Sequence, residues 1–326
     1  MAQDLDRRAL LSLAATAAAA PALAAGDPSP DSTQTVPLWP GEPPGARAPP
    51  PRETIVDRSK TSGFQDRYVT GVGRPLLTVF RPPKPNGAAA LICPGGGYIR
   101  VVIDKESFEV AHRLAAAGVT CFVLRYRLPA EGWDHAADVP LQDAQRAIRL
   151  IRAGADGFGV DPARVCAIGF SAGGHVAASL ATGFARGAYA PADAVDRVSA
   201  RPDLSALFYP VIDMARPFAH EGSREALLGK APTAAVEGAY SPHRHVTRET
   251  PPSFLVHALD DPAVPVENSL NYLAALRAAK VAAEAHLFEE GGHGFGIRLA
   301  QGKPAAAWPD LLLRWSARHG WLGARS

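Results

Sequence analysis

One hydroxyl lies among small residues in the stretch Gly169-Phe170-Ser171-Ala172-Gly173, directly after the apolar run 165–168. A turn between a strand and a helix would need small residues here for steric reasons alone. The same G-x-S-x-G pattern between a strand and a helix is also the context of a nucleophile elbow, a strained turn that presents a serine oxygen at the edge of a sheet. A helix that begins at Ala172 would add partial positive charge beside a developing oxyanion. We therefore interpret Ser171 as a nucleophile.

A serine hydroxyl is a poor nucleophile near neutral pH and needs a positioned base. In a sheet of this kind the partners follow the serine in the order acid, then histidine. His293 lies in the glycine-rich segment 289–296, directly after the last predicted strand, where a loop lets an imidazole approach the serine. The other downstream histidines fall in predicted strands, in the last predicted helix or in the region 213–250: His220, His243, His245, His257, His286 and His319. We expect His293 to be the general base.

Two adjacent carboxylates, Asp260 and Asp261, follow the preceding predicted strand. Either could accept a hydrogen bond from the imidazole Nδ1, which fixes the tautomer and stabilises the imidazolium. Position alone does not separate them, because both precede the same proline-bearing turn. Asp213, after another predicted strand, is a weaker candidate for the acid.

Three consecutive glycines follow another predicted strand, in Pro94-Gly95-Gly96-Gly97-Tyr98. Residues without side chains let backbone N–H groups come close to a substrate oxygen, as an oxyanion hole requires. We expect the amides of Gly96, Gly97 and Ala172 to form this hole. A phosphate-binding loop is the alternative, but the chain contains neither G-x-G-x-x-G nor G-K-[S/T].

The elements that must position these residues follow from hydrophobic periodicity. Short β-branched runs alternate with helical patterns, which predicts an α/β fold with a mostly parallel sheet covered by helices on both faces. Ligands bind at the carboxyl edge of such sheets, where the three candidate loops lie. The predicted strands are 88–93, 120–126, 165–170, 204–211, 254–259 and 285–288, and the predicted helices are 107–117, 139–153, 172–182, 267–279 and 308–320.

Two regions depart from this alternation. Residues 68–70 and 75–80 flank a Gly-Val-Gly turn and are predicted to form an antiparallel hairpin. Residues 213–250 contain glycines, prolines and short helical pieces, so we expect a short insertion over the carboxyl edge of the sheet. The α/β alternation and the two regions above together predict a single domain over residues 54–326.

Composition and net charge are those of a globular protein that does not bind nucleic acid. The 326 residues are 47% hydrophobic and 20% charged, which supports a sizeable core and shows no disorder signature. The net charge is only +2, and no basic run is dense enough for a nucleic-acid surface. We therefore expect no nucleic-acid partner.

Residues 1–24 have the pattern of a twin-arginine signal peptide. Arg7 and Arg8 precede leucines, the apolar run 9–20 is too short to span a membrane, and the A-x-A pattern predicts cleavage after Ala24. We expect a periplasmic or secreted protein without a stable membrane anchor after cleavage. The Pro-rich residues 25–53 should form an irregular arm that Trp39 attaches to the domain.

No metal site or dithiol site is expected. The three cysteines, Cys93, Cys121 and Cys166, lie in apolar strand-like runs without C-x-x-C spacing, which predicts buried free thiols. His243 and His245 have no third ligand nearby, so a solvated loop is the simpler interpretation.

Several further polar residues are interpreted as structural. His175 lies one helical turn after the candidate nucleophile and is expected to pack or form a hydrogen bond beneath the turn. Asp143 and Arg146 have the spacing of an ion pair on a helix surface. Arg125 and Arg127, at a strand end, are expected to anchor loops.

Six motifs, in order along the chain, resemble those of α/β-hydrolase esterases: PGGGY (94–98), LRYRLP (124–129), LQDAQRAIRLIR (141–152), GFSAGGH (169–175), HALDDPAVPVENS (257–269) and EEGGHGFG (289–296). The resemblance is to the bacterial acetyl-xylan esterase-like branch, often labelled endoxylanase-like, and it covers residues 36–322. It implies a serine carboxylic-ester hydrolase, without metal or organic cofactor, that acts on acetylated carbohydrates or small acyl esters.

The resemblance also assigns roles to single residues. The acid of the family's D-x-x-V-P motif falls on Asp261, the base on His293 and the nucleophile on Ser171. The histidine of the usual HGGG loop is replaced by Pro94, which leaves the choice of oxyanion donors open.

Two other functions remain as alternatives. One is a serine peptidase of the prolyl-peptidase type, although the mature chain is too short for the propeller domain that such peptidases usually carry. The other is a non-catalytic carbohydrate-binding protein on a hydrolase fold, because a fold does not determine a function. The sequence assigns no oligomeric state.

Overall fold

The computed structural model describes residues 32, 34–60 and 62–323. The predicted signal peptide 1–24 and the first part of the predicted arm lie outside the described residues. In the part of the chain that is described, no helix combines the length and the apolar character needed to cross a membrane.

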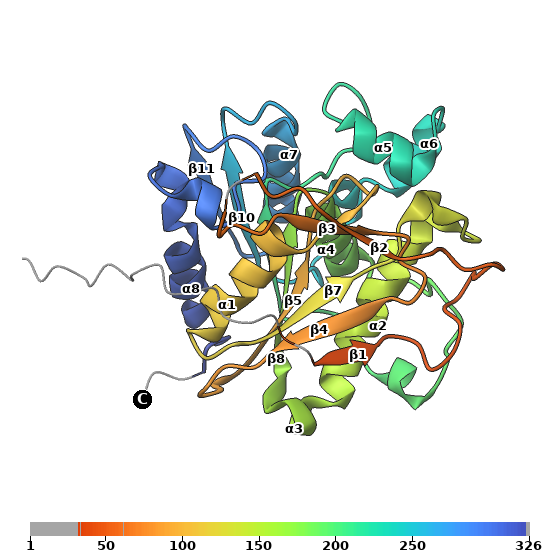
Figure 1. The fold of residues 1–326 in the computed structure, drawn as a ribbon. Coiled ribbons are helices and arrows are strands. Elements are labelled where there is room, and N and C mark those ends of the chain that lie inside the picture. The colour runs from red at the N-terminus through yellow and green to blue at the C-terminus, as the bar shows by residue number, and fades with distance from the viewer. Residues whose placement is uncertain (1–31, 33, 61, 324–326) are drawn as a thin grey trace, which may run out of the picture. The chain divides into compact units, whose positions relative to one another are not determined.

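An eight-stranded sheet forms the centre of the fold (Figure 1). Its strands lie in the order β1 (Thr35–Pro37), β4 (Leu76–Phe80), β7 (Thr120–Arg125), β5 (Gly87–Cys93), β8 (Val160–Phe170), β9 (Leu204–Phe208), β10 (Ser253–Ala258) and β11 (Ala283–Phe288). The strands from β7 to β11 in this order pair in parallel, whereas β1 and β4 add to one edge antiparallel. The predicted mostly parallel sheet is confirmed.

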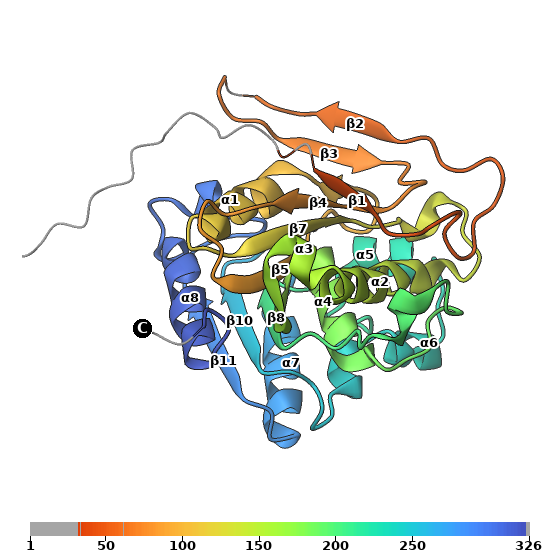
Figure 2. The ribbon, with the colours of Figure 1, turned by 90° about the horizontal axis from the view of Figure 1, so that it is seen from below.

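Helices cover both faces of this sheet (Figure 2). The helices α1 (Glu109–Ala115) and α8 (Trp308–Arg318) share one face, where Arg113 contacts Asp310. The helices α2 (Val139–Ala153), α4 (Ala172–Gly183) and α7 (Glu267–Ala278) lie on the other face. Parallel strands between two helical layers are apolar on both sides, and residues 88–93 of β5 are accordingly all fully buried.

Shorter helices join these elements. The predicted helix 107–117 begins as a π-helix, η1 (Asp104–Phe108), and continues as α1. Outside the segment 213–250, the other short helices of the described residues are α3 (Ala155–Phe158), η2 (Pro129–Glu131), η3 (Ala136–Asp138), η4 (Ala194–Arg197), η6 (Arg298–Ala300) and η7 (Pro304–Ala307).

The predicted hairpin between residues 68–70 and 75–80 is wrong. A separate three-stranded sheet contains β2 (Thr54–Asp57), β3 (Arg67–Thr70) and β6 (Val101–Val102), and among the described strands β3 pairs only within it. β4 pairs instead with β1 and β7. The turn between β3 and β4 is held by Glu131, whose carboxylate accepts hydrogen bonds from the amides of Gly71 and Val72. The local pattern correctly predicted β3 and β4 as strands, but it did not predict the strands with which they pair.

Strand pairing and a buried tryptophan are among the contacts that attach the described part of the predicted arm to the domain. β1 lies within it and pairs with β4, so this segment is not irregular throughout. Trp39 is buried, and its Nε1 donates a hydrogen bond to Asp143 Oδ1 at 2.9 Å.

The predicted surface ion pair of Asp143 and Arg146 is wrong, because both side chains face the interior. Asp143 binds the Arg127 guanidinium, with Nη2 2.8 Å from Oδ1 and neither side chain exposed. Arg146 binds Asp193 and Asp196, at 2.6 and 3.0 Å. The spacing within the helix carried no information about these partners, which lie on other elements.

The segment predicted as an insertion, 213–250, contains α5 (Glu221–Leu228), α6 (Ala234–Ala239) and the 3₁₀-helix η5 (Pro242–His245). In Figure 1, α5 and α6 lie beyond the carboxyl ends of the central strands. The loops that carry the candidate site residues follow the strands at this same edge of the sheet.

Candidate active site

Ser171 lies in a strained turn between β8 and α4. Its backbone has φ 53° and ψ −119°, a conformation that costs a residue with a side chain about 1–3 kcal/mol and persists only where the surroundings impose it. The surroundings do so here, because the Ser171 N–H donates to the Phe208 carbonyl at 3.0 Å and its own carbonyl accepts from Val211 at 3.0 Å. A Cβ atom on Gly173 would overlap the carbonyl oxygens of Cys93 and Pro94. The small residues therefore serve the turn, whereas nothing in the turn requires the hydroxyl.

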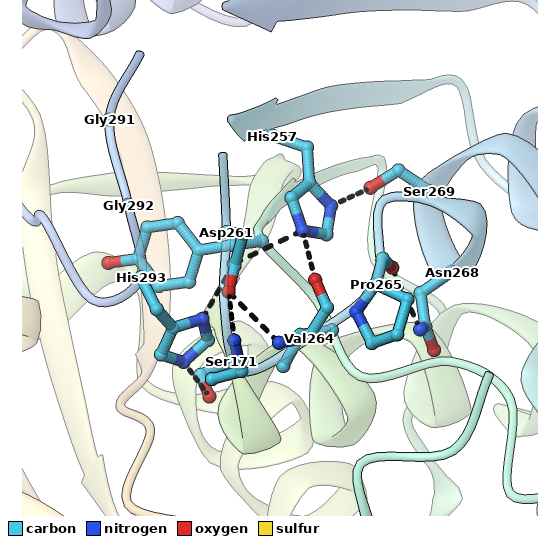
Figure 3. Close-up of polar contacts among 12 residues, drawn as sticks. Ser171, His257, Asp261, Val264, Pro265, Asn268, Ser269, Gly291, Gly292 and His293 are labelled. Carbon is cyan, nitrogen blue, oxygen red and sulfur yellow. Dashed lines mark hydrogen bonds and ion pairs between the residues drawn. The ribbon is translucent and has the colours of Figure 1, made fainter. Parts of the chain in front are cut away.

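The structure brings Ser171, His293 and Asp261 together in one hydrogen-bonded series (Figure 3). Ser171 Oγ lies 2.9 Å from His293 Nε2, and His293 Nδ1 lies 2.7 Å from Asp261 Oδ2. A carboxylate can only accept, so the Nδ1 of His293 carries the proton and its Nε2 is free to accept from the serine. The three side chains follow β8, β11 and β10, whose carboxyl ends meet at this edge.

Asp261 is held as a carboxylate by several donors. Burial alone would raise the pKa of Asp261, but hydrogen bonds from His257 and His293 lower it well below its usual range. The amides of Ala263 and Val264 add hydrogen bonds to Oδ1 at 2.8 and 2.9 Å. The acid is therefore negatively charged whenever the imidazole needs a counter-charge.

His257 is a partner of the acid that the sequence analysis missed. It is fully buried, and its Nε2 lies 3.3 Å from Asp261 Oδ2 and 3.0 Å from the Val264 carbonyl, while Nδ1 lies 2.8 Å from Ser269 Oγ. Figure 3 shows it on the side of Asp261 away from Ser171. A histidine inside an apolar strand gave no signal of this contact, because the turn after β10 brings the two side chains together.

The two adjacent carboxylates have different partners. Asp260 does not contact the imidazole in any described interaction; its Oδ1 accepts from the amides of Gly291 and Gly292 at 2.9 and 2.7 Å. It thus fixes the loop that carries His293. The weaker candidate, Asp213, binds Ala215 N at 2.9 Å and belongs to the insertion.

The glycine loop after β5 forms one wall of a cavity of about 260 Å³ that also contains Ser171 and His293. Gly96 has φ +130° and a Cβ atom there would overlap the Arg100 carbonyl oxygen, so only glycine fits. Among the described residues, the amides of Gly96, Gly97 and Ala172 donate to no protein acceptor. Gly96 and Gly97 line the cavity, whereas Ala172 is buried beneath the nucleophile and is not part of its wall.

His175 connects this loop to the insertion. Its Nε2 lies 2.7 Å from the Tyr240 carbonyl and its Nδ1 lies 2.6 Å from the Tyr98 hydroxyl. Burial lowers the pKa of His175 to about 4, so the ring is neutral. Because a carbonyl only accepts, Nε2 carries the proton and Nδ1 accepts from Tyr98, the residue directly after the glycines.

Glu106, also missed from the sequence, connects the glycine loop to the histidine loop. It is buried, and its carboxylate accepts from Gly95 N at 3.1 Å and from the Tyr209 hydroxyl at 3.2 Å. Tyr209 in turn accepts from Gly296 N at 3.1 Å and packs its ring against that of His293, with centroids 5.0 Å apart. The position of Glu106 in the sequence, on the π-helix η1, gave no signal of these contacts.

The described residues contain no group of three or more His, Cys, Asp or Glu side chains placed to hold a metal ion. His243 Nε2 lies 3.8 Å from Asp213 Oδ2, and His245 Nε2 lies 3.1 Å from the Gly238 carbonyl. The three cysteines are buried as free thiols, and burial raises their pKa values: Cys93, Cys121 and Cys166.

Curated proteins similar to this chain include two that act on xylan by name. An acetylxylan esterase of Xylanibacter ruminicola is 32% identical over 229 residues, which is 69% of this chain and 44% of the relative. Endo-1,4-beta-xylanase B of Butyrivibrio fibrisolvens is 35% identical over 207 residues, 64% of this chain and 32% of the relative. The chain thus spans less than half the length of these relatives.

Solved structures match over more of their own length. The acetyl ester-xyloside bifunctional hydrolase of Caldicellulosiruptor lactoaceticus aligns with a TM-score of 0.72 and 36% identity, over 90% of this chain and 98% of that one. The carboxylesterase Cest-2923 of Lactobacillus plantarum aligns with a TM-score of 0.64 and 27% identity, over 84% and 100%. Both likenesses agree with the α/β-hydrolase fold described above.

The family model described as BD-FAE matches residues 77–276, which include the glycine loop, the strained serine turn and Asp261. Since this match extends over more than half of the sequence, the chain belongs to the BD-FAE family.

Proposed function

We propose that this protein is a serine carboxylic-ester hydrolase that acts on acetylated carbohydrates or small acyl esters. The single observation that carries the proposal is the hydrogen-bonded series Asp261–His293–Ser171, which ends in a cavity lined by the glycine loop. Relatives named acetylxylan esterase and carboxylesterase support this reaction class. The arrangement supplies a nucleophile, a base and a counter-charge, which acyl transfer requires.

In the first half of the reaction His293 Nε2 takes the proton of Ser171 as Oγ attacks the ester carbonyl carbon. The carbonyl oxygen becomes an oxyanion, and the free amides of Gly96, Gly97 and Ala172 are its donors. Asp261 stabilises the imidazolium. The carbon–oxygen bond to the alcohol then breaks, the imidazolium protonates the leaving alcohol, and an acyl-serine remains.

In the second half water replaces the alcohol. His293 takes a proton from the water as its oxygen attacks the acyl-serine, and the same amides receive the second oxyanion. Collapse of this intermediate returns the proton to Ser171 Oγ and releases the carboxylic acid. With one water consumed, the two steps balance: the ester yields an alcohol and a carboxylic acid, and Ser171 and His293 return to their starting forms.

The decisive experiment compares Ser171→Ala with Ser205→Ala. Ser205 lies in β9, and its buried Oγ has no hydrogen-bond partner among the described residues, so its loss should leave activity unchanged. We expect Ser171→Ala to lose about 10⁵-fold or more of kcat on p-nitrophenyl acetate and on acetylated xylo-oligosaccharides. A fluorophosphonate should label the parent and Ser205→Ala but not Ser171→Ala.

Three outcomes would contradict the proposal. Parental turnover by Ser171→Ala would exclude the serine as nucleophile. Cleavage of prolyl anilides in place of esters would favour the peptidase. Binding of oligosaccharides without any turnover or labelling would favour a carbohydrate-binding protein.

We also propose export through the twin-arginine pathway, on the support of Arg7 and Arg8, the short apolar run and Ala24 in the sequence. Replacing both arginines by lysine should retain the full-length precursor in the cytoplasm. Periplasmic, processed protein from that variant would refute the assignment.

A further inference from the structure

Two cations flank the cavity that contains the proposed nucleophile. Arg100 and Lys105 line it together with Ser171 and His293. Both are partly exposed, so their charges can reach a ligand in the cavity. They come from one short segment, between the glycine loop and α1.

The backbone places these two residues beside two different loops of the site. The Arg100 carbonyl packs directly against Gly96, so Arg100 borders the glycine loop. The Lys105 carbonyl packs against Gly296, and its Nζ lies within 3.4 Å of the Cβ position of Gly294. Lys105 therefore borders the loop that carries His293.

Neither cation has a carboxylate partner in the described part of the chain. Arg100 lies over the ring of Tyr68, at 5.3 Å from its centroid, which orients the guanidinium without neutralising it. The one carboxylate in the cavity wall, Glu106, accepts from Gly95 N and the Tyr209 hydroxyl, and no ion pair joins it to Arg100 or Lys105 among the described residues. The two cations without a carboxylate partner outnumber this one carboxylate, which leaves positive charge in the wall for an anion of the substrate.

The other basic residues of this wall are already accounted for. Arg58 binds Asp66, with Nε 2.7 Å from Oδ2. Burial lowers the pKa of His220, which keeps its ring neutral at neutral pH. Arg100 and Lys105 are therefore the cations left to meet a charged substrate.

We infer that the cavity takes acetyl esters of sugars that carry a carboxylate, that is, O-acetylated uronates, and that this carboxylate binds Lys105 and Arg100. The inference rests on the proposed function. An acetyl group has no charge of its own, so the anion must belong to the alcohol part of the ester. A uronate carries its carboxylate as part of the sugar skeleton, whereas a sulfate or a phosphate would have to be added to a hydroxyl group.

Space beyond the cavity fits an alcohol part larger than one ring. An adjoining hollow of about 620 Å³ shares Arg58 and Lys105 with the cavity wall. It also contains the exposed apolar side chains of Phe64 and Leu299. A neighbouring sugar of an oligosaccharide would lie here.

The test uses two probes that differ only in charge: a methyl O-acetyl-glucopyranosiduronic acid and its carboxamide. We expect the parent enzyme to prefer the charged probe by about 10-fold or more in kcat/KM at low salt, and salt at about 0.5 M to remove most of this preference. Lys105→Met and Arg100→Met should each reduce the preference about 3- to 10-fold. The change should appear mainly in KM, because the contact exists before the transition state as well as in it.

Lys84→Met is the matched control. Lys84 is exposed and precedes β5, so it lies at the strand end opposite the site, and its loss should leave the preference unchanged. Equal rates on both probes with the parent enzyme would overturn the inference, and so would a preference that survives both cavity variants. Failure to cleave either probe would also overturn it. Ser171-dependent cleavage of p-nitrophenyl acetate then shows whether the proposed function stands without it.

Discussion

Replacing Asp261 by asparagine should lower kcat by about 10³- to 10⁴-fold while leaving the protein folded. Asp261 Oδ1 accepts from the amides of Ala263 and Val264, which fixes the side chain so that the other oxygen faces His293. In the variant, the same two amides would hold the amide oxygen. The NH₂ group would then face Nδ1 of the imidazole, and the proton of His293 would move to Nε2, where it prevents acceptance from Ser171.

The magnitude follows from the geometry. Oδ2 and Nδ1 are 2.7 Å apart, and the charge of an imidazolium is spread over the ring. A separation of about 4 Å and an effective dielectric constant of about 20 give about 4 kcal/mol. Since about 1.4 kcal/mol corresponds to a tenfold change in rate, the lost charge accounts for about 10³-fold, and the wrong tautomer adds to it.

The assay compares Asp261→Asn with Asp260→Asn on p-nitrophenyl acetate. Asparagine at 260 keeps an acceptor for the amides of Gly291 and Gly292, so kcat should stay within about 5-fold of the parent. Thermal unfolding shows whether each variant is folded. An equal loss in both variants, or a folded Asp261→Asn enzyme with parental kcat, would refute the assignment of Asp261 as the counter-charge.

Asp261 also links stability to pH. Its pKa is lowered in the folded protein, so the carboxylate stabilises the folded state above its unfolded pKa of about 3.9 and this contribution is lost as the pH falls below it. Asp261→Asn should therefore lose less stability than the parent between about pH 5 and pH 3. Urea unfolding across that range checks the sign, and an identical acid loss in both proteins would contradict it.

Three other perturbations test other parts of the structure. Gly96→Ala should reduce kcat about 100-fold or more with a smaller change in KM, because its Cβ would displace the Arg100 carbonyl and move the oxyanion donors; steady-state kinetics measure this. Arg127→Met should destabilise the fold by about 3–5 kcal/mol in urea unfolding, because it leaves the Asp143 carboxylate buried without its cation. His175 has a folded pKa of about 4 against 6.5 for the unfolded state, so its contribution is complete above about pH 6.5 and falls by about 3 kcal/mol as the pH drops to 4; His175→Gln should abolish this pH dependence in urea unfolding.

Local patterns were sufficient for the elements of the parallel core. The apolar stripe over 139–153 predicted α2 with its observed bounds, and the runs that became β5 and β10 were each found within one residue of their observed ends. The end of β8 was also found, but this strand begins at Val160, five residues before its predicted start. A helix such as α2 is buried along one stripe and a central parallel strand on both faces. The hydrophobic pattern of each segment alone therefore indicates its type.

Local sequence patterns did not predict which strands pair or which polar side chains meet at the site. The pattern around β3 and β4 indicated two strands, but an edge can bind any partner, and neither β2 nor the two-residue β6 was predicted. Glu106 reaches the site because distant loops converge on it, and His257 reaches Asp261 because the turn after β10 folds the chain back. A buried carboxylate on a helix and a histidine in a strand are ordinary features until the fold supplies their neighbours.

The Tyr98–His175–Tyr240 connection limits how the insertion could be exchanged. Grafting residues 213–250 from a relative is an obvious route to a new substrate preference. Such a chimera must return a backbone carbonyl to the place that Tyr240 now occupies, since the imidazole that binds it also steadies the glycine loop. A graft that misses this atom would slow turnover even where every substrate contact had been copied faithfully.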